Sequence, residues 1–183
     1  MPLETGIYTE EEAVYGHDFS YRLAKWIGEY LPKNKSVIDV GCGPAWYLRY
    51  LHDIGFIDLL GIEGTPQNFE YGNVVLHDLS TPIPFQNKGN VISLEVGEHI
   101  PEEYSQTFLD NLCALCNGKL ILSWAIPGQD GIGHVSCRHN IWVIREMERR
   151  GFELLVDDTL TVRTVVEDRV GYFRNTLMIF KRK

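Results

Sequence analysis

Three side chains that can bind a cation or move a proton stand close together in residues 95–99. If the backbone turns helically after Glu95, then Glu95, Glu98 and His99 fall on one face, because side chains three and four positions apart are neighbours on a helix. Carboxylates that meet in a cleft repel one another and lose their water, and a divalent cation resolves this conflict. We therefore expect a metal site here, although an arginine or water could also resolve it.

A turn that contains two glycines stands where it could hold a ligand. Gly41-Cys42-Gly43 follows a β-branched run, and helical spacing of apolar residues begins directly after it. Glycines let the backbone approach a ligand closely, and doubly wound sheets bind ligands at the carboxyl ends of their strands. A nicotinamide cofactor fits poorly, because its motif needs a third glycine where this chain has Trp46, and no arginine stands nearby to bind a phosphate.

The elements that must position these residues alternate between short β-branched runs and longer segments with helical spacing, which is typical of βαβ units and a parallel sheet. We predict an α/β fold that is Rossmann-like and doubly wound, with a mostly parallel seven-stranded sheet and an antiparallel edge strand. The predicted strands are Ser36–Val40, Leu59–Glu63, Val74–His77, Val91–Glu95, Leu120–Ser123, Phe152–Val156 and Thr176–Phe180.

Five helices are expected between and before these strands. The first is capped by Asp18, the second has Pro44 in its first turn, and Gly151 ends the fourth. They cover Asp18–Tyr30, a segment from Pro44 with a stripe of Tyr47, Leu48 and Leu51, then Glu102–Cys116, Asn140–Arg150 and Thr159–Glu167. The length of 183 residues, 44% of them hydrophobic, suits one domain over 1–183, with an N-terminal lid and helix in 1–32 and the core in 36–183.

The run Val37-Ile38-Asp39-Val40-Gly41-Cys42-Gly43 resembles the first motif of the class I S-adenosylmethionine-dependent methyltransferases. The signals that follow occur in that family's order along nearly the whole chain. The resemblance implies that the methionine part of the cofactor lies over the glycine turn and that the ribose hydroxyls bind Glu63 at the end of the second strand. Asp78, after the third strand, would receive the adenine amino group. The implied cofactor-binding residues are Asp39, Gly41, Cys42, Gly43, Glu63, Asp78 and Leu79.

Each of these signals alone has an ordinary structural explanation. The glycine turn could be only a turn, Glu63 a surface acid and Asp78 a helix cap. Their succession at three consecutive strand ends favours a bound cofactor. One departure is Ala45, which stands where the family often has a glycine and which leaves the close turn possible.

The pattern Glu95-x-x-Glu98-His99 is similar to that of two metal-dependent branches of this family, the ubiquinone-pathway O-methyltransferases and the small-RNA 2′-O-methyltransferases. Both branches act on vicinal oxygens. In the RNA branch a further histidine completes the metal site from the loop after the next strand, and residues 124–138 would form that loop here. The resemblance implies a divalent cation, magnesium or manganese, held by Glu95, Glu98, His99 and His134. Metal-free relatives also carry Glu-His at this position, where the histidine caps or packs.

The mechanism follows from the chemistry of methyl transfer to oxygen. A hydroxyl becomes reactive when it loses its proton or when a metal stabilises its anion. We therefore predict an O-methyltransferase with catalytic residues His134, His99 and Glu98, in which His134 or a hydroxide on the metal takes the proton. Without a metal, His99 or His134 would be the general base of a methyltransferase acting on nitrogen, carbon or carboxylate. A non-catalytic module that binds the cofactor is the third alternative.

Composition restricts the acceptor and the location. A formal net charge of −8 repels a phosphate backbone, so nucleic acid is not expected as a partner. No segment is apolar for long enough to span or dock on a membrane, and the spacing of Cys42, Cys113, Cys116 and Cys137 fits neither a disulfide framework nor a zinc site. We expect a cytoplasmic enzyme that acts on a small molecule, with a vicinal diol of a sugar or glycan as the favoured acceptor. The sequence does not predict the oligomeric state.

The N-terminal segment around Tyr15-Gly16-His17-Asp18 precedes the first strand, and in related folds such segments close over the cofactor. His17 could face the site or lie on the surface. Stacking faces for a pyranose could come from Tyr8, Tyr15, Trp46 and Trp124.

Overall fold

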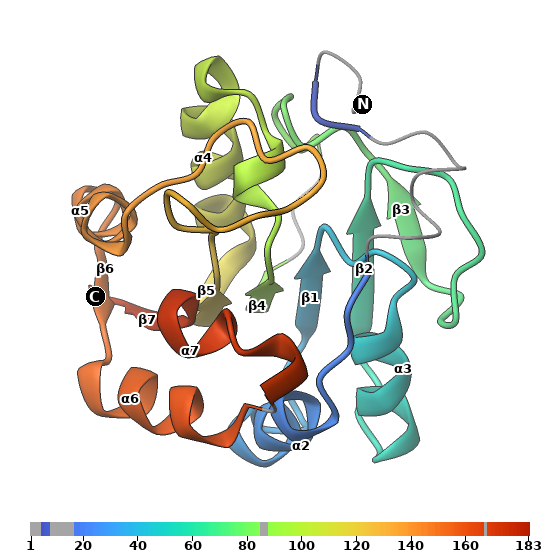
Figure 1. The fold of residues 1–183 in the computed structure, drawn as a ribbon. Coiled ribbons are helices and arrows are strands. Elements are labelled where there is room, and N and C mark those ends of the chain that lie inside the picture. The colour runs from blue at the N-terminus through green and yellow to red at the C-terminus, as the bar shows by residue number, and fades with distance from the viewer. Residues whose placement is uncertain (1–4, 8–16, 85–87, 167) are drawn as a thin grey trace.

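The computed structural model of the chain describes residues 5–7, 17–84, 88–166 and 168–183. Within them, one seven-stranded sheet has the order β3-β2-β1-β4-β5-β7-β6 (Figure 1). The strands are β1 Val37–Val40, β2 Leu59–Glu63, β3 Val74–Leu76, β4 Gly89–Ser93, β5 Cys116–Leu122, β6 Phe152–Leu154 and β7 Met178–Arg182. The predicted mostly parallel α/β sheet is confirmed. The antiparallel strand β7 pairs with both β5 and β6, so it lies one position in from the edge, and β6 is the edge strand.

Helices cover both faces of this sheet (Figure 1). On one face, α2, α3 and α6 pack against sheet residues such as Val37 and Ile121. On the other face, α4 and α5 pack against residues such as Ile38 and Leu120. Because consecutive strand residues point to opposite faces, strands covered on both sides are largely apolar, as the β-branched runs predicted. The helices are α2 Tyr21–Tyr30, α3 Trp46–Asp53, α4 Ser105–Leu115, α5 Asn140–Arg149, α6 Val156–Val165 and α7 Phe173–Thr176.

Several predicted boundaries were wrong, each for a local reason. The first helix is capped by Ser20, whose side chain accepts a hydrogen bond from the Leu23 N–H, and not by Asp18. The next helix begins at Trp46, after Ala45 in a left-handed conformation with φ of 65°, so Pro44 lies outside it. The strand predicted to reach Glu95 ends at Ser93, because Glu95 also has a positive φ, of 52°.

The other differences are shifts along the chain. A 3-10 turn, Glu102–Tyr104, takes the start of the third predicted helix. The helix predicted over 159–167 is α6, which begins at Val156, and the start of the last predicted strand is α7. Gly151 follows α5 with φ of 82°, as a glycine C-cap should.

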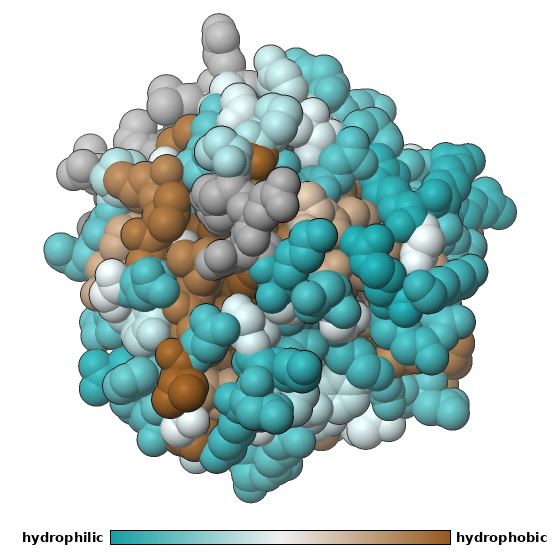
Figure 2. All heavy atoms as spheres, turned by 180° about the vertical axis from the view of Figure 1, so that it is seen from behind, coloured by the Kyte–Doolittle hydropathy of each residue, from teal (hydrophilic) through white to brown (hydrophobic). Residues whose placement is uncertain are grey.

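The surface is mostly hydrophilic when seen from behind, with apolar side chains gathered on one side (Figure 2). Two exposed apolar side chains, Val75 and Leu76, belong to the edge strand β3. Among the described helices, none combines the length and the apolar character that a membrane crossing requires.

Candidate functional site

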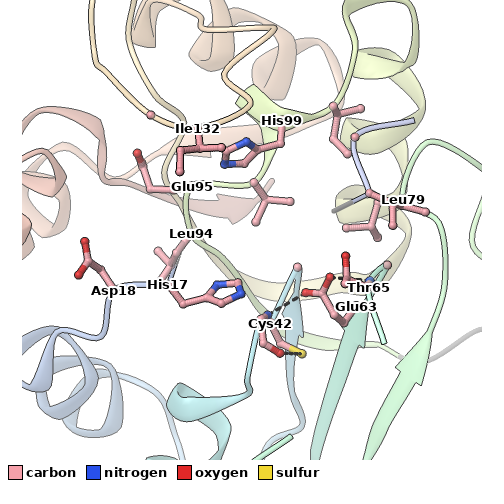
Figure 3. A pocket seen from close by; sticks show the side chains of 18 of the residues that line it. His17, Asp18, Cys42, Glu63, Thr65, Leu79, Leu94, Glu95, His99 and Ile132 are labelled. Atoms are coloured by element: carbon pink, nitrogen blue, oxygen red, sulfur yellow. Dashed lines mark hydrogen bonds between the residues drawn. The ribbon is translucent and has the colours of Figure 1, made fainter. Parts of the chain in front are cut away.

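A cavity of about 710 Å³ opens at the carboxyl ends of β1, β2 and β4. All seven residues predicted to bind the cofactor line it, and so do Glu95, His99 and His134. Glu63 and Thr65 enter it from one side and Glu95 and His99 from the other (Figure 3). Glu98 is not among the lining residues, because its side chain is fully buried. The carboxyl ends of the strands thus bring into one cavity residues that lie far apart in the sequence.

The glycine turn is tied closely to the neighbouring strand β2. Gly41 and Gly43 have φ of 73° and 52°, and a Cβ on Gly41 would lie 2.5 Å from Cγ2 of Val96, so the turn requires glycine there. The N–H of Gly43 donates to Oε2 of Glu63 (2.8 Å). Ala45 adopts the left-handed conformation, which glycine takes more readily. This preference accounts for the glycine that the methyltransferase family resembled by this sequence often has at this position.

Asp39 is a buried acid without a complete set of partners. Its side chain is 3% exposed, and Oδ2 accepts no hydrogen bond from the described residues. Burial, and then the negative charge of Glu63, raises the pKa of Asp39 to about 8. A positively charged ligand group would compensate this carboxylate, which makes Asp39 a recognition point for a cation or ammonium in the cavity.

The stability of the ligand-free protein should therefore depend on pH through Asp39. In the unfolded chain this group ionises above its ordinary pKa of 3.8, whereas the folded protein keeps the proton up to about pH 8. The folded state thus binds more protons, and its stability falls as pH rises through this window. Asp39→Asn should gain stability relative to wild type by at most about 1.4 kcal/mol per pH unit. Urea unfolding at pH 5 and pH 8 measures this, and an equal difference at both values would contradict the assignment.

The two acids after β2 and β3 also hold their own loops. Oε1 of Glu63 accepts a hydrogen bond from the Thr65 N–H (2.9 Å), and burial raises the pKa of Glu63. Oδ1 of Asp78 accepts one from the Ser80 N–H (2.9 Å). Each carboxylate oxygen accepts more than one hydrogen bond, so both acids can still meet a ligand.

A second group of polar residues lies beyond the glycine turn and is called here the acid–histidine cluster: Glu98, His99 and His134. Each residue offers a ligand atom, and these atoms lie within 4.8 Å of one another. Glu98 and His99 belong to a 3-10 turn, Gly97–His99, and His134 comes from the loop between β5 and α5. The sequence predicted that four side chains converge, these three and Glu95, and the ligand atoms of these three do lie together.

Both histidines of the cluster are oriented by backbone carbonyls. Nδ1 of His99 lies 3.2 Å from the Gly133 oxygen, and Nδ1 of His134 lies 3.0 Å from the Gln129 oxygen. A carbonyl can only accept a hydrogen bond, so Nδ1 carries the proton in each ring and the lone pair of the neutral ring is on Nε2. Histidines that bind metals are usually held in this way.

Glu98 is the least compensated group of the cluster. Its side chain is 0% exposed, and neither carboxylate oxygen accepts a hydrogen bond of normal geometry from the described residues. Oε1 lies 3.9 Å from Nε2 of His134. Burial, and then the charge of Glu95, raises the pKa of Glu98 well above its usual value. A buried carboxylate is costly unless it is protonated, paired or bound to a cation.

Glu95, the fourth predicted ligand, lies beside this cluster, and its role as a ligand stays a prediction. Oε1 of Glu95 accepts a hydrogen bond from the Thr176 hydroxyl (3.0 Å), and Oε2 accepts one from the Gln129 amide. The prediction assumed a helical turn directly after Glu95, whereas this residue has a positive φ, and its side chain binds Thr176. Glu95 lines the cavity beside the cluster and not within it.

Comparison with solved structures identifies the fold. A sugar N-methyltransferase, KedS8 of Streptoalloteichus sp., matches with a TM-score of 0.67 and 15% identity over 92% of this chain and 96% of its own. A TehB-like SAM-dependent methyltransferase of Corynebacterium glutamicum matches with 0.64 and 19% over 94% and 93%. Magnesium protoporphyrin IX methyltransferase of Synechocystis, with bound SAH, matches with 0.64 and 18% over 88% and 80%. The chain has the methyltransferase fold. No family model and no curated protein sequence matches it.

In this methyltransferase fold, the aromatic residues predicted as stacking faces have different places. Trp124 is fully buried, and its indole N–H donates to the Ser136 oxygen (2.7 Å), so it anchors the loop of His134 and cannot stack on a ligand. Trp46 lines the cavity. Tyr8 and Tyr15 lie outside the described residues.

Several residues in the cavity wall or just behind it had no signal in the sequence. Gln129 and Thr176 hold Glu95, and Tyr172 donates to Oδ2 of Asp18 (3.3 Å) from the opposite end of the chain. No motif marks them, since they reach the site only through the packing of α7 and the loop after β5. His17 does line the cavity, as the sequence allowed.

Proposed function

We propose that the protein is an S-adenosylmethionine-dependent methyltransferase. The observation that carries this proposal is the cavity at the strand ends of a methyltransferase fold, with the seven predicted cofactor residues in its wall. The residues present fit the cofactor. Asp39 is a buried acid that lacks a partner for a cationic group, and Glu63 stands where a carboxylate can accept from ribose hydroxyls. When bound, S-adenosylmethionine supplies an electrophilic methyl group.

We further propose that the acid–histidine cluster holds a divalent cation, magnesium or manganese, in an O-methyltransferase. The donor set fits, because the site combines an uncompensated buried carboxylate with two imidazoles whose Nδ1 atoms are already engaged. Three protein ligands leave positions for two oxygens of an acceptor. Such a cation supplies positive charge that stabilises an acceptor oxygen as it loses its proton. The chain's own contribution is to orient the rings and to keep water from Glu98.

The proposed acceptor is a small vicinal diol, with a sugar or glycan favoured. The described residues that line the cavity include no lysine or arginine, whereas Asp18, Glu95 and Asp130 add to the acids of the cofactor side. This charge disfavours acceptors that carry phosphate or carboxylate groups and leaves uncharged polyols acceptable. A structurally similar protein is a sugar N-methyltransferase, which supports the class of acceptor but not the methylated atom.

A metal-free methyltransferase with His99 or His134 as general base is the second candidate. Burial lowers the pKa of His99 to about 4, so this ring is neutral at pH 7 and has a lone pair. A base with so low a pKa is a weak proton acceptor, since efficient general bases have pKa values near the working pH. A neutral His99 ring suits a metal ligand equally well. The burial of the Glu98 carboxylate is explained only if a metal ion or a proton neutralises its charge.

Binding of S-adenosylhomocysteine tests the cofactor proposal. At 100 times its Kd, a ligand selective for the folded state should add about 2.7 kcal/mol of stability and raise the melting temperature. Glu63→Ala should weaken binding by about tenfold or more, because two charge-assisted hydrogen bonds to the ribose are lost. Calorimetric titration of protein freed of carried-over ligand measures both. Unchanged melting at saturating ligand would reject the proposal.

A further inference from the structure

We infer that His17 binds the carboxylate of the cofactor's amino-acid part. This inference rests on the proposed function, since it requires S-adenosylmethionine in the cavity. The His17 ring lies directly over the glycine turn: a Cβ on Gly43 would fall 2.7 Å from Nδ1 of His17. Figure 3 shows the ring beside Cys42, on the side of the cavity away from Leu79. His17 therefore stands where the turn meets the open end of the cavity.

The glycine turn itself has no main-chain donor to spare for an anion. The N–H groups of Gly41 and Cys42 donate to the Ile62 oxygen (2.8 and 3.1 Å). That of Gly43 donates to Glu63, and that of Ala45 to the Cys42 oxygen (2.9 Å). The remaining residue of the turn, Pro44, has no N–H. Main-chain donors for a carboxylate near this turn therefore come only from the first turn of α3, which begins at Trp46, and a side-chain donor would complete its binding.

His17 is the best placed side-chain donor among the described residues. The cavity wall that they form has no lysine or arginine, and the other two histidines in it, His99 and His134, belong to the cluster and are engaged through Nδ1. His17 makes no hydrogen bond with the described part of the chain, and its ring has at least one N–H in either protonation state. The amino end of α3, which starts at Trp46, adds an electrostatic preference for an anion here.

The surrounding charges suit a zwitterion. Asp39 is placed for the ammonium group, whereas His17 lies on the outer side, where the main cavity meets a shallower groove of about 560 Å³ that His17, Asp18 and Trp46 also line. The groove has two arginines, but Arg49 binds Asp53 and Arg169 donates to the Phe19 oxygen. A carboxylate directed toward Asp39 or Glu63 would be repelled, and one directed toward His17 would find a donor. The rival donor is the indole N–H of Trp46, whose ring meets the His17 ring edge-on at 6.4 Å between centroids.

A pair of ligands isolates the proposed contact. S-Adenosylhomocysteine carries the carboxylate, and its decarboxylated analogue, S-adenosyl-3-thiopropylamine, keeps the adenosine, the sulfur and the amine. His17→Ala should weaken binding of S-adenosylhomocysteine by about tenfold, which is typical for a lost hydrogen bond to a charged group, and should leave the analogue within about twofold. His17→Gln, which keeps an N–H donor, should recover part of the loss. Isothermal titration of the ligand-free protein measures all of these values.

Two variants serve as controls. His52→Ala removes an exposed histidine of α3 that does not line the cavity and should change neither affinity. Trp46→Phe removes the rival donor while keeping an aromatic ring. Equal losses for both ligands in His17→Ala, no loss for either, or selective loss in Trp46→Phe alone would each overturn the inference. Wild-type protein that binds neither ligand would contradict the proposed function itself, and the inference would fall with it.

Discussion

Glu98→Gln is expected to weaken Mn²⁺ binding by at least about 100-fold and to reduce methyl transfer by a similar factor. The substitution keeps the size of a side chain that is 0% exposed and replaces its carboxylate by a neutral amide. That charge has no hydrogen-bond donor of normal geometry among the described residues, so the cation is its expected partner. Affinity for S-adenosylhomocysteine should stay within about twofold, because Glu98 does not line the cavity.

Two measurements of Mn²⁺ binding check this prediction without relying on a known acceptor, and a third measures methyl transfer. Calorimetric titration gives the Mn²⁺ affinity, and Mn²⁺ should raise the melting temperature of wild type but not of the variant. Methyl transfer to methyl α-L-rhamnopyranoside, a sugar with a vicinal diol, provides the activity. Glu103→Gln makes the same chemical change at an exposed position outside the cluster and should behave as wild type. Wild-type activity that survives exhaustive chelation would favour a metal-free base.

Gly131→Ala is expected to inactivate the site nearly as completely as His134→Ala. A Cβ at Gly131 would lie 2.1 Å from Nε2 of His134, which is the atom that faces Glu98. The ring is the end of a rotatable side chain, so it should swing away while the backbone stays in place. We expect loss of Mn²⁺ binding and of methyl transfer by on the order of 100-fold, with the melting temperature of the metal-free protein nearly unchanged.

A matched glycine separates this effect from a general cost of replacing glycine. A Cβ at Gly72 would have no heavy atom within 4 Å, so Gly72→Ala should leave Mn²⁺ affinity, cofactor affinity and activity unchanged. Spectroscopic titration with Co²⁺, which reports the number of nitrogen ligands, would show one imidazole fewer in Gly131→Ala. Full Mn²⁺ affinity in this variant would show that the His134 ring has room elsewhere or does not bind the ion.

The sheet could be predicted from the sequence because most strands are short apolar runs and three consecutive strands end in a ligand-binding signal. Leu59–Glu63 was predicted to the residue, and the cofactor residues at three strand ends do share one cavity. The errors lie where single-residue conformations decide. Within the described ranges, two residues other than glycine, Ala45 and Glu95, adopt positive φ, which no pattern in hydrophobicity indicates.

The convergence of Glu98, His99 and His134 was also predictable, but the position of Glu95 was not. The spacing of three and four residues assumes a regular turn, and the turn observed is a 3-10 segment that begins only at Gly97. The partners of Glu95, Gln129 and Thr176, come from distant parts of the chain. Contacts of this kind depend on how the last helix and strand pack, which local propensity does not determine.

The strand order has a consequence for how the protein is made. β6 lies at the edge and pairs only with β7, which follows it by more than twenty residues in the chain. During synthesis, β6 is therefore translated before its ladder partner among the described strands. β7 also supplies Ile179 to one core cluster and Met178 and Phe180 to the other. Neither apolar layer is complete without β7, so a released chain that stops within residues 155–177 should remain a substrate for chaperones and proteases.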